Sequence, residues 1–509
     1  MRACVFMMNL NGEKSNRKAE SFRICGYQDG LKGRIYNALM KFNRSLCFVD
    51  DSMIKALIYA NRAEVYFKLK LYDKCLNNIQ LARDDNCTKE ALEVLLELEE
   101  NCLKEIYENG QQSEKHWDFF QLTYPANNKL PYVANCLELK NVPKFGRLIT
   151  AKQDLQVGDI ITIEKPFFKI LKTDPDDSEY PETNIYSYCA NCLSDNFMDL
   201  IPCKKCNSTM FCSKKCQNEA DKGFHQYECE ILSVLNETDN WRMTFRCFFD
   251  ALTICNGSFE ELTDLLQKSD ELSPTVFNFD FSGSDHAKQA KLQLMCMLAL
   301  EHRVDIETRD FKHIFVMQPK LAEMWADHGE FINKFLERMM QIEILNFHGI
   351  KGRSLNQSKP YRTCVGDGGY TFCSLINHSC CPNVMRIIVE NRMVVIVERP
   401  IKKGDQLFDC YIGDSFYFKP KISRIKELED YQFECECDAC INDFPQVMTG
   451  EIKSVDKVLH ASVDRFYNEL KDPRRVLTPE NAREWAVKYS QILQKNYRQE
   501  LKLKLPIKM

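Results

Sequence analysis

The sequence predicts an α+β protein of several domains. Its 509 residues are too many for one hydrophobic core. Stretches with the apolar spacing of helices alternate with stretches that have the two-residue alternation of strands. Cysteines and one histidine recur at spacings typical of zinc ligands. With 44% hydrophobic and 28% charged residues, the chain has an ordinary globular balance, so we expect most of it to fold.

Composition excludes several classes of protein. A net charge of -5 gives no general electrostatic reason to bind nucleic acid. The first residues hold a six-residue apolar run, which is too short for a secretion signal, and no stretch approaches the roughly 20 apolar residues of a membrane helix. We therefore expect a soluble intracellular monomer in nucleus and cytoplasm, with no membrane contact. In such a protein, 25 cysteines indicate metal sites or buried thiols.

Residues 1–110 predict pairs of antiparallel helices. Small and large residues follow the spacing of a tetratricopeptide (TPR) repeat at Tyr59, Ala63, Tyr66, Tyr72, Cys75, Ile79 and Ala82. Ala38, Phe42 and Ser45 repeat the offsets of the last three. The separation is slightly longer than the repeat's period, and Cys87 replaces its usual proline. TPR-like hairpins would form a groove for peptide tails; a plain helical hairpin is the alternative.

Two later regions predict a small twisted sheet. Residues 144–165 alternate as a β-hairpin, with Gly146 and Gly158 at its turns. Residues 386–390, 393–398 and 406–412 alternate as short strands around two turns.

The segment from Cys189 to Cys229 predicts two zinc sites. Its seven thiols and one imidazole occur as Cys189-x-x-Cys192, Cys203-x-x-Cys206, Cys212-x-x-x-Cys216 and His225-x-x-x-Cys229. Each pair offers two ligands at a bite that a tetrahedral ion accepts, so four pairs complete two closed, structural sites. The spacing alone does not say which pairs share an ion. Buried free cysteines are the alternative, which four paired spacings disfavour.

Helices are predicted in two further regions. Residues 261–272 and 288–304 have apolar residues at i, i+3, i+4 and i+7, and by this pattern Met295 and Met297 belong to a core. The stretch ENAREWAVKYSQILQKNYRQELK is amphipathic and predicts a helical segment near the C-terminus.

A third metal site is predicted from two distant motifs. Cys435, Cys437 and Cys440 in YQFECECDAC leave a tetrahedral zinc one ligand short. The segment NHSCCPN offers the missing thiolate from Cys380 or Cys381. Such a link would pin the tail against the core and would give partners to a polar cluster that is costly to bury alone.

These motifs resemble known families. The cysteine block resembles a MYND zinc finger. A first strand with GR, then NHSCxPN, GDQLFDCY and YxFxCxCxxC follow the order of a SET domain. With the cysteine block after the first of these motifs, the arrangement resembles the SET-and-MYND (SMYD) protein-lysine methyltransferases over roughly residues 140–441. The N-terminal helices resemble the branch called member four.

The resemblance implies a split SET β-fold with an inserted MYND finger, a helical insertion and a post-SET zinc site. The implied parts are a TPR-like region 1–110, the SET N-terminal part 135–188, the MYND finger 189–229, the helical insertion 230–345, the SET C-terminal part 346–415, the post-SET motif 416–445 and a C-terminal helical segment 446–509. The family usually ends in a long helical-repeat domain, which this sequence lacks. We expect either a truncated sequence or a paralogue with an open cleft.

The implied reaction is methyl transfer from S-adenosylmethionine to a lysine amine, which requires a cofactor pocket and a lysine channel that meet at one point. The implied cofactor contacts are Lys144, Phe145, Gly146, Arg147, Asn346, Asn377, His378, Tyr411 and Phe433. Tyr411 and Tyr431 are the implied catalytic residues: Tyr411 at the methyl-transfer pore and Tyr431 along the lysine channel. Because a phenol with a pKa near 10 is a poor base at neutral pH, we expect Tyr411 to orient the reactants.

The resemblance also assigns three zinc ions. The MYND ligands interleave, so Cys189, Cys192, Cys212 and Cys216 would hold one ion, and Cys203, Cys206, His225 and Cys229 the second. By family position, Cys380 would join Cys435, Cys437 and Cys440 at the third, and Pro382 and Asn383 would turn the chain.

The implied function is methylation of lysines in histone or non-histone proteins. The MYND and TPR-like modules would bind peptides of partners such as a chaperone or corepressor. One alternative is a catalytically inactive adaptor whose SET fold is a scaffold. Another, a zinc-dependent DNA-binding regulator, is disfavoured by the acidic balance and the absence of a basic stripe.

Overall fold

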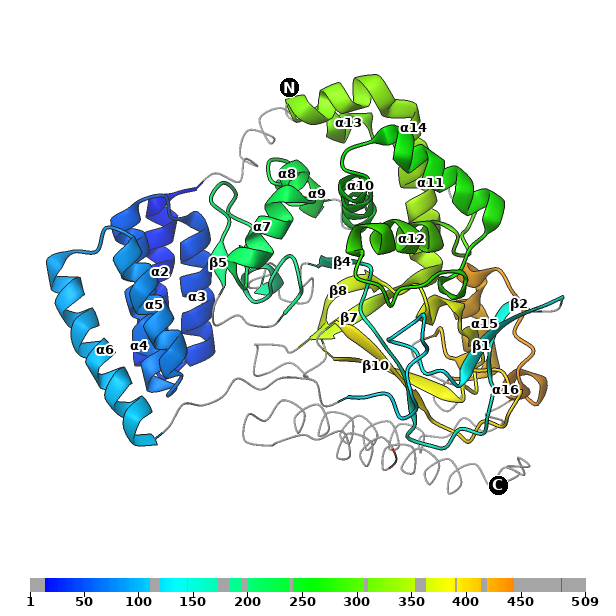
Figure 1. The fold of residues 1–509 in the computed structure, drawn as a ribbon. Helices are drawn as coiled ribbons and strands as arrows, with labels where there is room; N and C mark the ends of the chain where they lie inside the picture. Colours follow the sequence, from blue (N-terminus) through cyan, green and yellow to red (C-terminus); the bar gives the residue numbers. More distant parts are fainter. Residues whose placement is uncertain are drawn as a thin grey trace.

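The fold is taken from a computed structural model, shown in Figure 1. It describes residues 14–109, 120–143, 145–172, 183–194, 200–237, 241–305, 310–352, 363–389, 391–412 and 419–443, together with Val487. Lys144 and, apart from Val487, the predicted segment 446–509 lie outside the described residues. Among the described helices, none has the length and hydropathy of a membrane span.

Five helices form an N-terminal helical unit at the left of Figure 1. They are α2 (Asn16–Leu31), α3 (Ile35–Phe48), α4 (Ser52–Lys68), α5 (Tyr72–Asp84) and α6 (Lys89–Asn109). Ser15 and Asp51 cap α2 and α4, since each side chain accepts a backbone N–H of the first turn. Nine residues of the repeat pattern are at most 2% exposed: Ala38, Phe42, Ser45, Tyr59, Ala63, Tyr66, Cys75, Ile79 and Ala82. Tyr72 is partly buried. The helices form over these residues, and their assignment to the TPR class stays a prediction.

The segment that carries the first two metal clusters lies next to this unit. It contains η1 (Thr183–Tyr186), the two-stranded sheet β5 (Ile201–Pro202) and β6 (Met210–Phe211), and the helices α7 (Lys214–Lys222), α8 (His225–Glu228) and α9 (Leu232–Glu237). Two fully buried side chains of the helical unit bond to its backbone: Asn43 Nδ2 donates to Tyr186 O at 2.9 Å and Arg62 Nη1 to Leu200 O at 2.8 Å. The helical unit and this cysteine-rich segment therefore share a buried polar interface.

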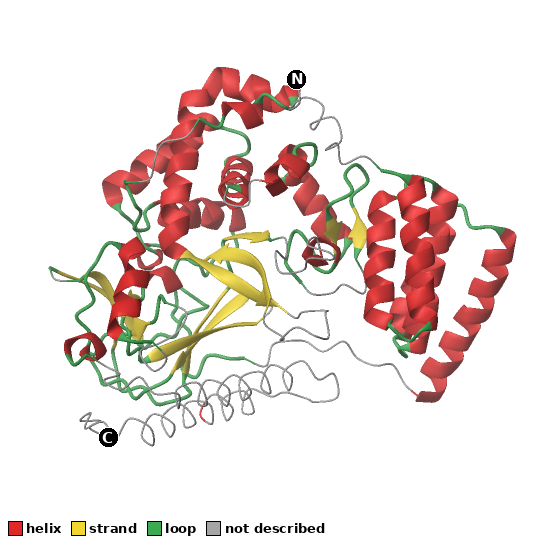
Figure 2. Cartoon of the chain, turned by 180° about the vertical axis from the view of Figure 1, so that it is seen from behind, coloured by secondary structure: helices red, strands yellow, loops and turns green. Residues whose placement is uncertain are grey.

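Short strands form four further sheets, which lie together below the helices in Figure 2. One sheet pairs β1 (Leu137–Val142) with β2 (Gly146–Ala151). A second has the order β10 (Val384–Val389), β11 (Arg392–Val397), β3 (Ile160–Glu164), and a third has the order β4 (Phe168–Leu171), β8 (Thr363–Gly369), β7 (Phe347–Gly352). The fourth pairs β9 (Asn377–His378) with β12 (Phe408–Asp409) in parallel.

The predicted hairpin over residues 144–165 is wrong in its pairing. The two strands form, but β2 pairs with the preceding β1, and β3 pairs with β11 far along the chain. Gly146 and Gly158 have φ of +61° and +89°, so both occupy left-handed turns as expected. Alternation alone cannot choose a partner, because a strand with one buried face satisfies its pattern in either sheet.

Helices form the upper right of Figure 1. They are α10 (Arg242–Ile254), α11 (Phe259–Leu272), η2 (Val276–Asn278), α12 (His286–Leu298), α13 (Lys312–Phe315) and α14 (Pro319–Asn346). Met295 and Met297 are 6% and 0% exposed, which confirms that they belong to the core. The helical pattern predicted through Val304 ends at Leu298 instead, because Ala299 and Glu301 turn their carbonyl groups toward Arg147 and Asn346.

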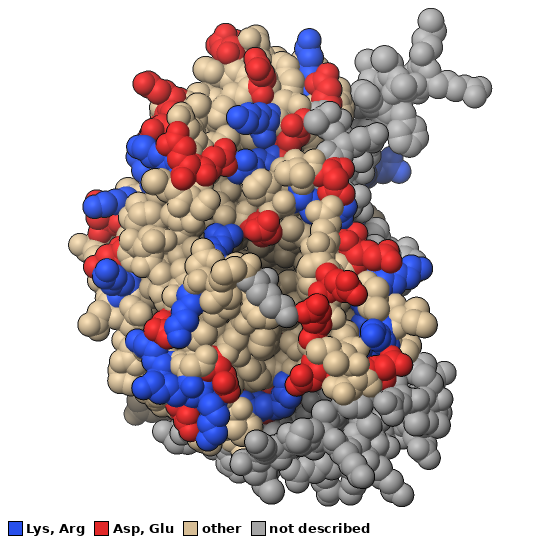
Figure 3. Space-filling view, turned by 90° about the vertical axis from the view of Figure 1, so that its right-hand side faces the viewer, with Lys and Arg blue, Asp and Glu red and all other residues tan. Residues whose placement is uncertain are grey.

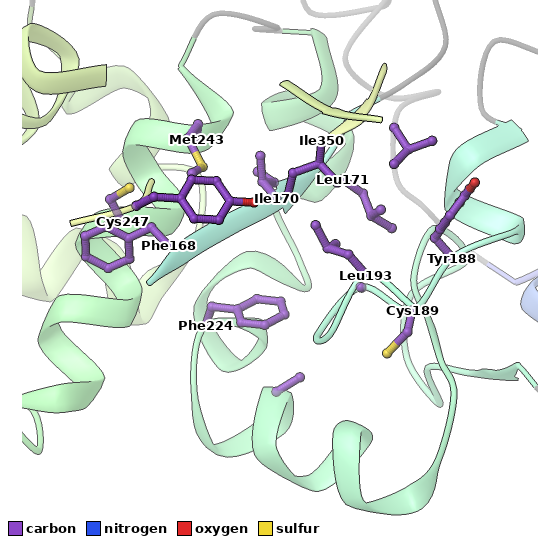
Figure 4. Close-up of a cluster of buried hydrophobic side chains, with 14 of the residues drawn as sticks. Phe168, Ile170, Leu171, Tyr188, Cys189, Leu193, Phe224, Met243, Cys247 and Ile350 are labelled. Carbon is purple, nitrogen blue, oxygen red and sulfur yellow. The ribbon is translucent and has the colours of Figure 1, made fainter. Parts of the chain in front are cut away.

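The cysteine-rich segment, α10 and the sheet of β4 share one apolar core (Figure 4). Figure 4 shows Phe168 and Leu171 of β4 with Phe224, Met243 and Leu193 from the other two parts. All five are at most 5% exposed. Burying such side chains stabilises the fold by about 1.5–3 kcal/mol each.

A buried ion pair crosses the same junction. Arg246 on α10 donates to both oxygens of Glu228 on α8, each at 2.6 Å, and its guanidinium lies 3.3 Å from the ring centroid of Phe224. The two side chains are 3% and 1% exposed. The two donor bonds match a planar guanidinium to a carboxylate, which is the geometry that makes a buried pair tolerable.

Before the NHSCCPN segment lies η3 (Cys373–Leu375), and the tail, residues 419–443, contains α15 (Lys421–Leu428), η4 (Glu429–Tyr431) and α16 (Asp438–Ile441). Its buried apolar cluster is separate from the main core and consists of Cys380, Cys381, Ile412, Leu428, Ala439 and Cys440. Two of these six side chains, Cys380 and Cys440, are predicted zinc ligands, so the predicted metal site lies within the cluster that packs the tail against the NHSCCPN segment.

We expect Arg246→Met to lower the free energy of unfolding by about 3–5 kcal/mol, because it leaves Glu228 charged and buried without its partner. The matched control is Lys268→Met, which removes the exposed i,i+4 pair with Asp264, where both side chains are 52% exposed. This control should cost about 0.5 kcal/mol or less. Chemical denaturation followed by tryptophan fluorescence measures both, and equal effects would contradict the assignment.

Candidate functional site

The structure brings the twelve predicted metal ligands into three groups. They are Cys189, Cys192, Cys212 and Cys216; Cys203, Cys206, His225 and Cys229; and Cys380, Cys435, Cys437 and Cys440. Within each group, the ligand atoms lie within 4.8 Å of one another. Neighbouring sulfur atoms are 3.5–3.9 Å apart. The edge of a tetrahedron of sulfur atoms around zinc is about 3.8 Å, so both the donors and their spacing fit this ion.

Local structure holds the ligands of the first two groups in place. Ser213 caps α7 by accepting the N–H of Cys216, which places this thiol at the helix start. His225 begins α8, and its Nε2 lies 3.2 Å from the sulfur of Cys203 and 3.8 Å from that of Cys206. The cap at Ser213 and the start of α8 at His225 therefore place ligands from separate parts of the segment around the same two sites.

Cys380 and Cys381 have different surroundings. The sulfur of Cys380 is 3.5 Å from that of Cys440 and 3.9 Å from that of Cys435. Cys381 is buried beside the cluster, and its sulfur lies 3.3 Å from the hydroxyl of Ser379. The geometry therefore places Cys380 in the group of four and leaves Cys381 outside it.

Two hydrogen bonds hold Tyr411 just after β12. Its backbone N–H donates to Nδ1 of His378 at 2.9 Å, and its hydroxyl donates to the carbonyl of Ile376, also at 2.9 Å. The parallel pairing of β9 with β12 brings these residues together. Burial raises the pKa of the Tyr411 phenol, so the hydroxyl keeps its proton at neutral pH.

His378 acts between Tyr411 and the third cluster. Because Nδ1 accepts an N–H, the proton of the neutral ring is on Nε2, which lies 3.4 Å from the sulfur of Cys380. Burial lowers the pKa of His378 to about 4, which favours this neutral form. Both ring nitrogens are therefore used within the protein. The predicted cofactor contact of His378 stays a prediction for its backbone and ring face.

Aromatic rings gather around Tyr411. The ring centroid of Tyr431 lies 5.0 Å from that of Tyr411, and Phe433 lies 6.4 Å from Tyr411 at an interplanar angle of 88°. Phe433 is also 5.8 Å from His378 and remains 41% exposed. Tyr431 and Phe433 come from the tail just before Cys435, so the third cluster places them against β9 and β12.

The GR strand, β2, is hydrogen-bonded to Asn377 of β9. Asn377 Nδ2 donates to the carbonyl of Arg147 at 3.1 Å and lies 3.5 Å from that of Phe145. Phe145 is 48% exposed, and no atom lies within 4 Å of the position that a Cβ on Gly146 would occupy. Phe145 beside Asn377 and Phe433 beside His378 are exposed rings next to β9, and with the open backbone at Gly146 they fit a flat heteroaromatic ligand with polar edges. Lys144, the first residue of this motif, lies outside the described residues.

Asn346 and Arg147 both bind the loop after α12. The amide of Asn346 donates to Glu301 O at 2.7 Å and to Ile342 O at 2.9 Å, and the residue is 5% exposed. Arg147 Nη1 donates to Ala299 O at 3.3 Å. The structure thus gives Asn346 a role in holding this loop, and a cofactor contact from it would have to use an oxygen atom.

Three buried or partly buried charged residues of the strands were missed in the sequence: Arg386, Asp409 and Glu164. Arg386 on β10 forms an ion pair with Asp409 and donates to Cys410 O at 3.0 Å. Glu164 on β3 is 1% exposed and accepts the backbone N–H groups of Phe372 and Cys373 at 2.8 and 2.9 Å. The sequence signal that could have revealed them is a charged residue at a strand position where the alternation predicts an apolar one.

Figure 3 views the right-hand side of Figure 1, where β1, β2 and α15 lie. The surface is hollowed near the centre of this face. Asp and Glu side chains gather along one side of the hollow, while uncharged atoms line most of its floor.

Comparisons with known proteins identify a SET domain over residues 146–412, slightly more than half of the chain. The chain is 21% identical to protein-lysine N-methyltransferase SMYD4 of Homo sapiens, in an alignment that covers 78% of this chain and 63% of that protein. It is 25% identical to a SET and MYND domain-containing protein of Dictyostelium discoideum, in an alignment that covers 65% of this chain and 86% of that protein. It is 23% identical to histone-lysine N-methyltransferase ASHR1 of Arabidopsis thaliana, in an alignment that covers 60% of this chain and 55% of that protein. The chain thus spans less than two thirds of the human relative.

Metal analysis of the purified protein should find three zinc ions per chain, because the structure groups four ligands at each of three places. Cys380→Ser should reduce the count to two, since it removes one ligand of the third group. Cys381→Ser is the matched control, one residue away and also buried beside the cluster, and should retain three. Two ions in the unmodified protein, or equal losses in the two variants, would refute the grouping.

Proposed function

Because the chain belongs to the SET-domain family, and its relatives place it among the SMYD proteins, we propose that it is an S-adenosylmethionine-dependent protein-lysine N-methyltransferase. The observation that carries the proposal is the meeting of Asn377, His378, Tyr411, Tyr431 and Phe433 at the β9–β12 pair. When bound, S-adenosylmethionine supplies a methyl group on a positively charged sulfur. The chain's own residues then have to bind the cofactor, orient the amine and exclude water.

Asn377 and the GR strand would bind the cofactor. The carbonyls of Phe145 and Arg147 are tied to Asn377, so the strand edge and β9 are held as one surface. Phe433 would stack on the adenine from the tail, with Gly146 open on the strand. Preorganised backbone of this kind lowers the entropy cost of binding.

Tyr411 would orient the reacting groups. Its hydroxyl proton points to Ile376 O, which leaves the oxygen's lone pairs free to accept from an incoming amine or a polarised methyl group. Because burial raises the phenol's pKa, the residue does not act as a base. Tyr431, 5.0 Å away between ring centroids, would line the path of the lysine side chain. Alignment of donor and acceptor is then the main contribution to rate.

The finer organisation is part of the proposal. We infer that residues 189–229 form a MYND finger within the split SET domain, and that the helical unit binds peptides as a TPR-like array. Relatives named as SET and MYND domain proteins support the first, and the buried small residues of α3 to α5 support the second. The substrates would be proteins, and the enzyme would reside in both the nucleus and the cytoplasm.

An inactive adaptor is the second candidate. Asn43 and Arg62 join the helical unit to the cysteine-rich segment through buried hydrogen bonds. The two parts could therefore act together as one surface that binds partner proteins, which favours the adaptor. It requires no ligand at Asn377 and Phe433, so cofactor binding separates the two functions.

Calorimetric titration with S-adenosylmethionine tests the cofactor site without knowledge of the substrate. We expect the zinc-loaded protein to bind and Asn377→Ala to bind at least about tenfold more weakly, since the variant releases the GR strand from β9. Asn101→Ala, on the exposed side of α6, is the control and should bind normally. A folded, zinc-loaded protein that binds nothing would favour the adaptor.

Tyr411→Phe should lower turnover of a lysine-peptide pool at least about tenfold, while cofactor affinity stays within about twofold. The variant retains the ring and loses only the hydroxyl with its bond to Ile376 O. Tyr107→Phe, at a side chain that is 91% exposed, serves as control. Unchanged turnover in the Tyr411 variant would remove this residue from the mechanism.

A further inference from the structure

We propose that Arg386 is a positioning residue for Tyr411, and that its pair with Asp409 sets the backbone from which the Tyr411 ring projects. The inference rests on the proposed function, since it assigns the residue that orients the proposed catalytic tyrosine. It adds a residue that touches neither cofactor nor lysine in the proposed site.

The guanidinium of Arg386 contacts three separate elements. Nε forms an ion pair with the carboxylate of Asp409, and Nη2 donates to Cys410 O at 3.0 Å. Nη1 lies 2.8 Å from a ring nitrogen of His348 on β7. Since a guanidinium only donates, the facing nitrogen of His348 carries no proton. One side chain on β10 thereby joins β7 and the end of β12.

These contacts immobilise both peptide groups that precede the Tyr411 side chain. The N–H of Cys410 donates to Asp409 Oδ1 at 2.7 Å, and its carbonyl accepts from Arg386. The next N–H, that of Tyr411, donates to His378. Three side chains therefore fix consecutive backbone groups on a segment that is in strand geometry only as far as Asp409. A change in the peptide plane at Cys410 would rotate the Tyr411 ring away from Ile376 O.

Burying the Arg386–Asp409 ion pair costs hydration free energy, so the pair is expected to have a role in positioning the backbone. The side chains of Arg386 and Asp409 are 17% and 6% exposed, so two charges lose most of their hydration. A buried ion pair is weak support for stability compared with apolar residues of the same volume. What this pair supplies, and an apolar pair could not, is a directed donor to Cys410 O and an acceptor for Cys410 N–H.

Arg386→Lys separates position from charge. Lysine keeps a cation for Asp409, but its single ammonium cannot also reproduce the planar set of donors to Cys410 O and His348. We expect hydrogen exchange at the Cys410 and Tyr411 amides to rise about tenfold, as measured by mass spectrometry of peptides that span residues 405–412. Arg399→Lys is the matched control, because Arg399 donates to Pro382 O at 2.8 Å and to Cys381 O instead. It should leave exchange at these two amides unchanged.

Kinetics then ask whether Arg386 acts through Tyr411. Arg386→Lys should lower kcat about tenfold, with cofactor affinity and the KM for a lysine peptide little changed. In a Tyr411→Phe background, the same substitution should have almost no further effect on kcat. A merely structural role would reduce the folded fraction and add its effect fully to that of Tyr411→Phe.

If Arg386→Lys does not fold, the double variant Arg386→Gln with Asp409→Asn removes both charges together, so that neither is buried alone. The exchange measurement applies to it unchanged. Unaltered exchange at Cys410 and Tyr411 in a folded variant, or fully additive kinetic effects, would overturn the inference. A native protein that methylates no peptide would refute the proposed function, while the exchange result would still decide whether Arg386 positions Tyr411.

Discussion

The candidate site depends on one link, the approach of Cys380 to three thiols that lie 55 to 60 residues further along the chain. The tail that contains Tyr431 and Phe433 has a small apolar cluster of its own and adds no strand to the described sheets. A zinc ion at these four ligands would tie this tail to the NHSCCPN segment, with a binding free energy on the order of 10 kcal/mol. His378 connects the link to the chemistry, because one ring nitrogen faces Cys380 and the other holds the backbone of Tyr411.

A small number of buried contacts also joins the remaining parts of the chain. The cysteine-rich segment is joined to the sheet, since Leu193 and Phe224 pack with β4 and α10, and the Arg246–Glu228 pair crosses the same junction. On its other side, this segment accepts hydrogen bonds from Asn43 and Arg62 of the helical unit. Metal binding, helix packing and the sheet core are therefore parts of one continuous structure, and loss of the first two metal sites would loosen the helical unit as well as the sheet edge.

Much of this organisation could be predicted from local pattern. Ligand spacing predicted the paired cysteines and the number of metal sites, and the family resemblance supplied the three groups that the structure assembles. Helical periodicity found α11 and α12. Strand pairing could not be predicted, because β2 and β3 satisfy the same alternation with partners that only the tertiary fold supplies. Arg386 and Asp409 were missed for a related reason: each is one charged residue in an apolar strand, and only the structure shows that they face each other. The end of α12 at Leu298 was also hidden, because the bonds from Arg147 and Asn346 come from distant segments.

The central claim is that the third cluster builds the cofactor site by holding Phe433 and Tyr431 against β9 and β12. The most direct test is calorimetric titration of S-adenosylmethionine into Cys380→Ser protein that retains its first two zinc ions and its fold. The account predicts that this protein loses cofactor binding, because the tail is no longer pinned beside Asn377. Affinity equal to that of the unmodified protein, with the third cluster broken, would contradict it.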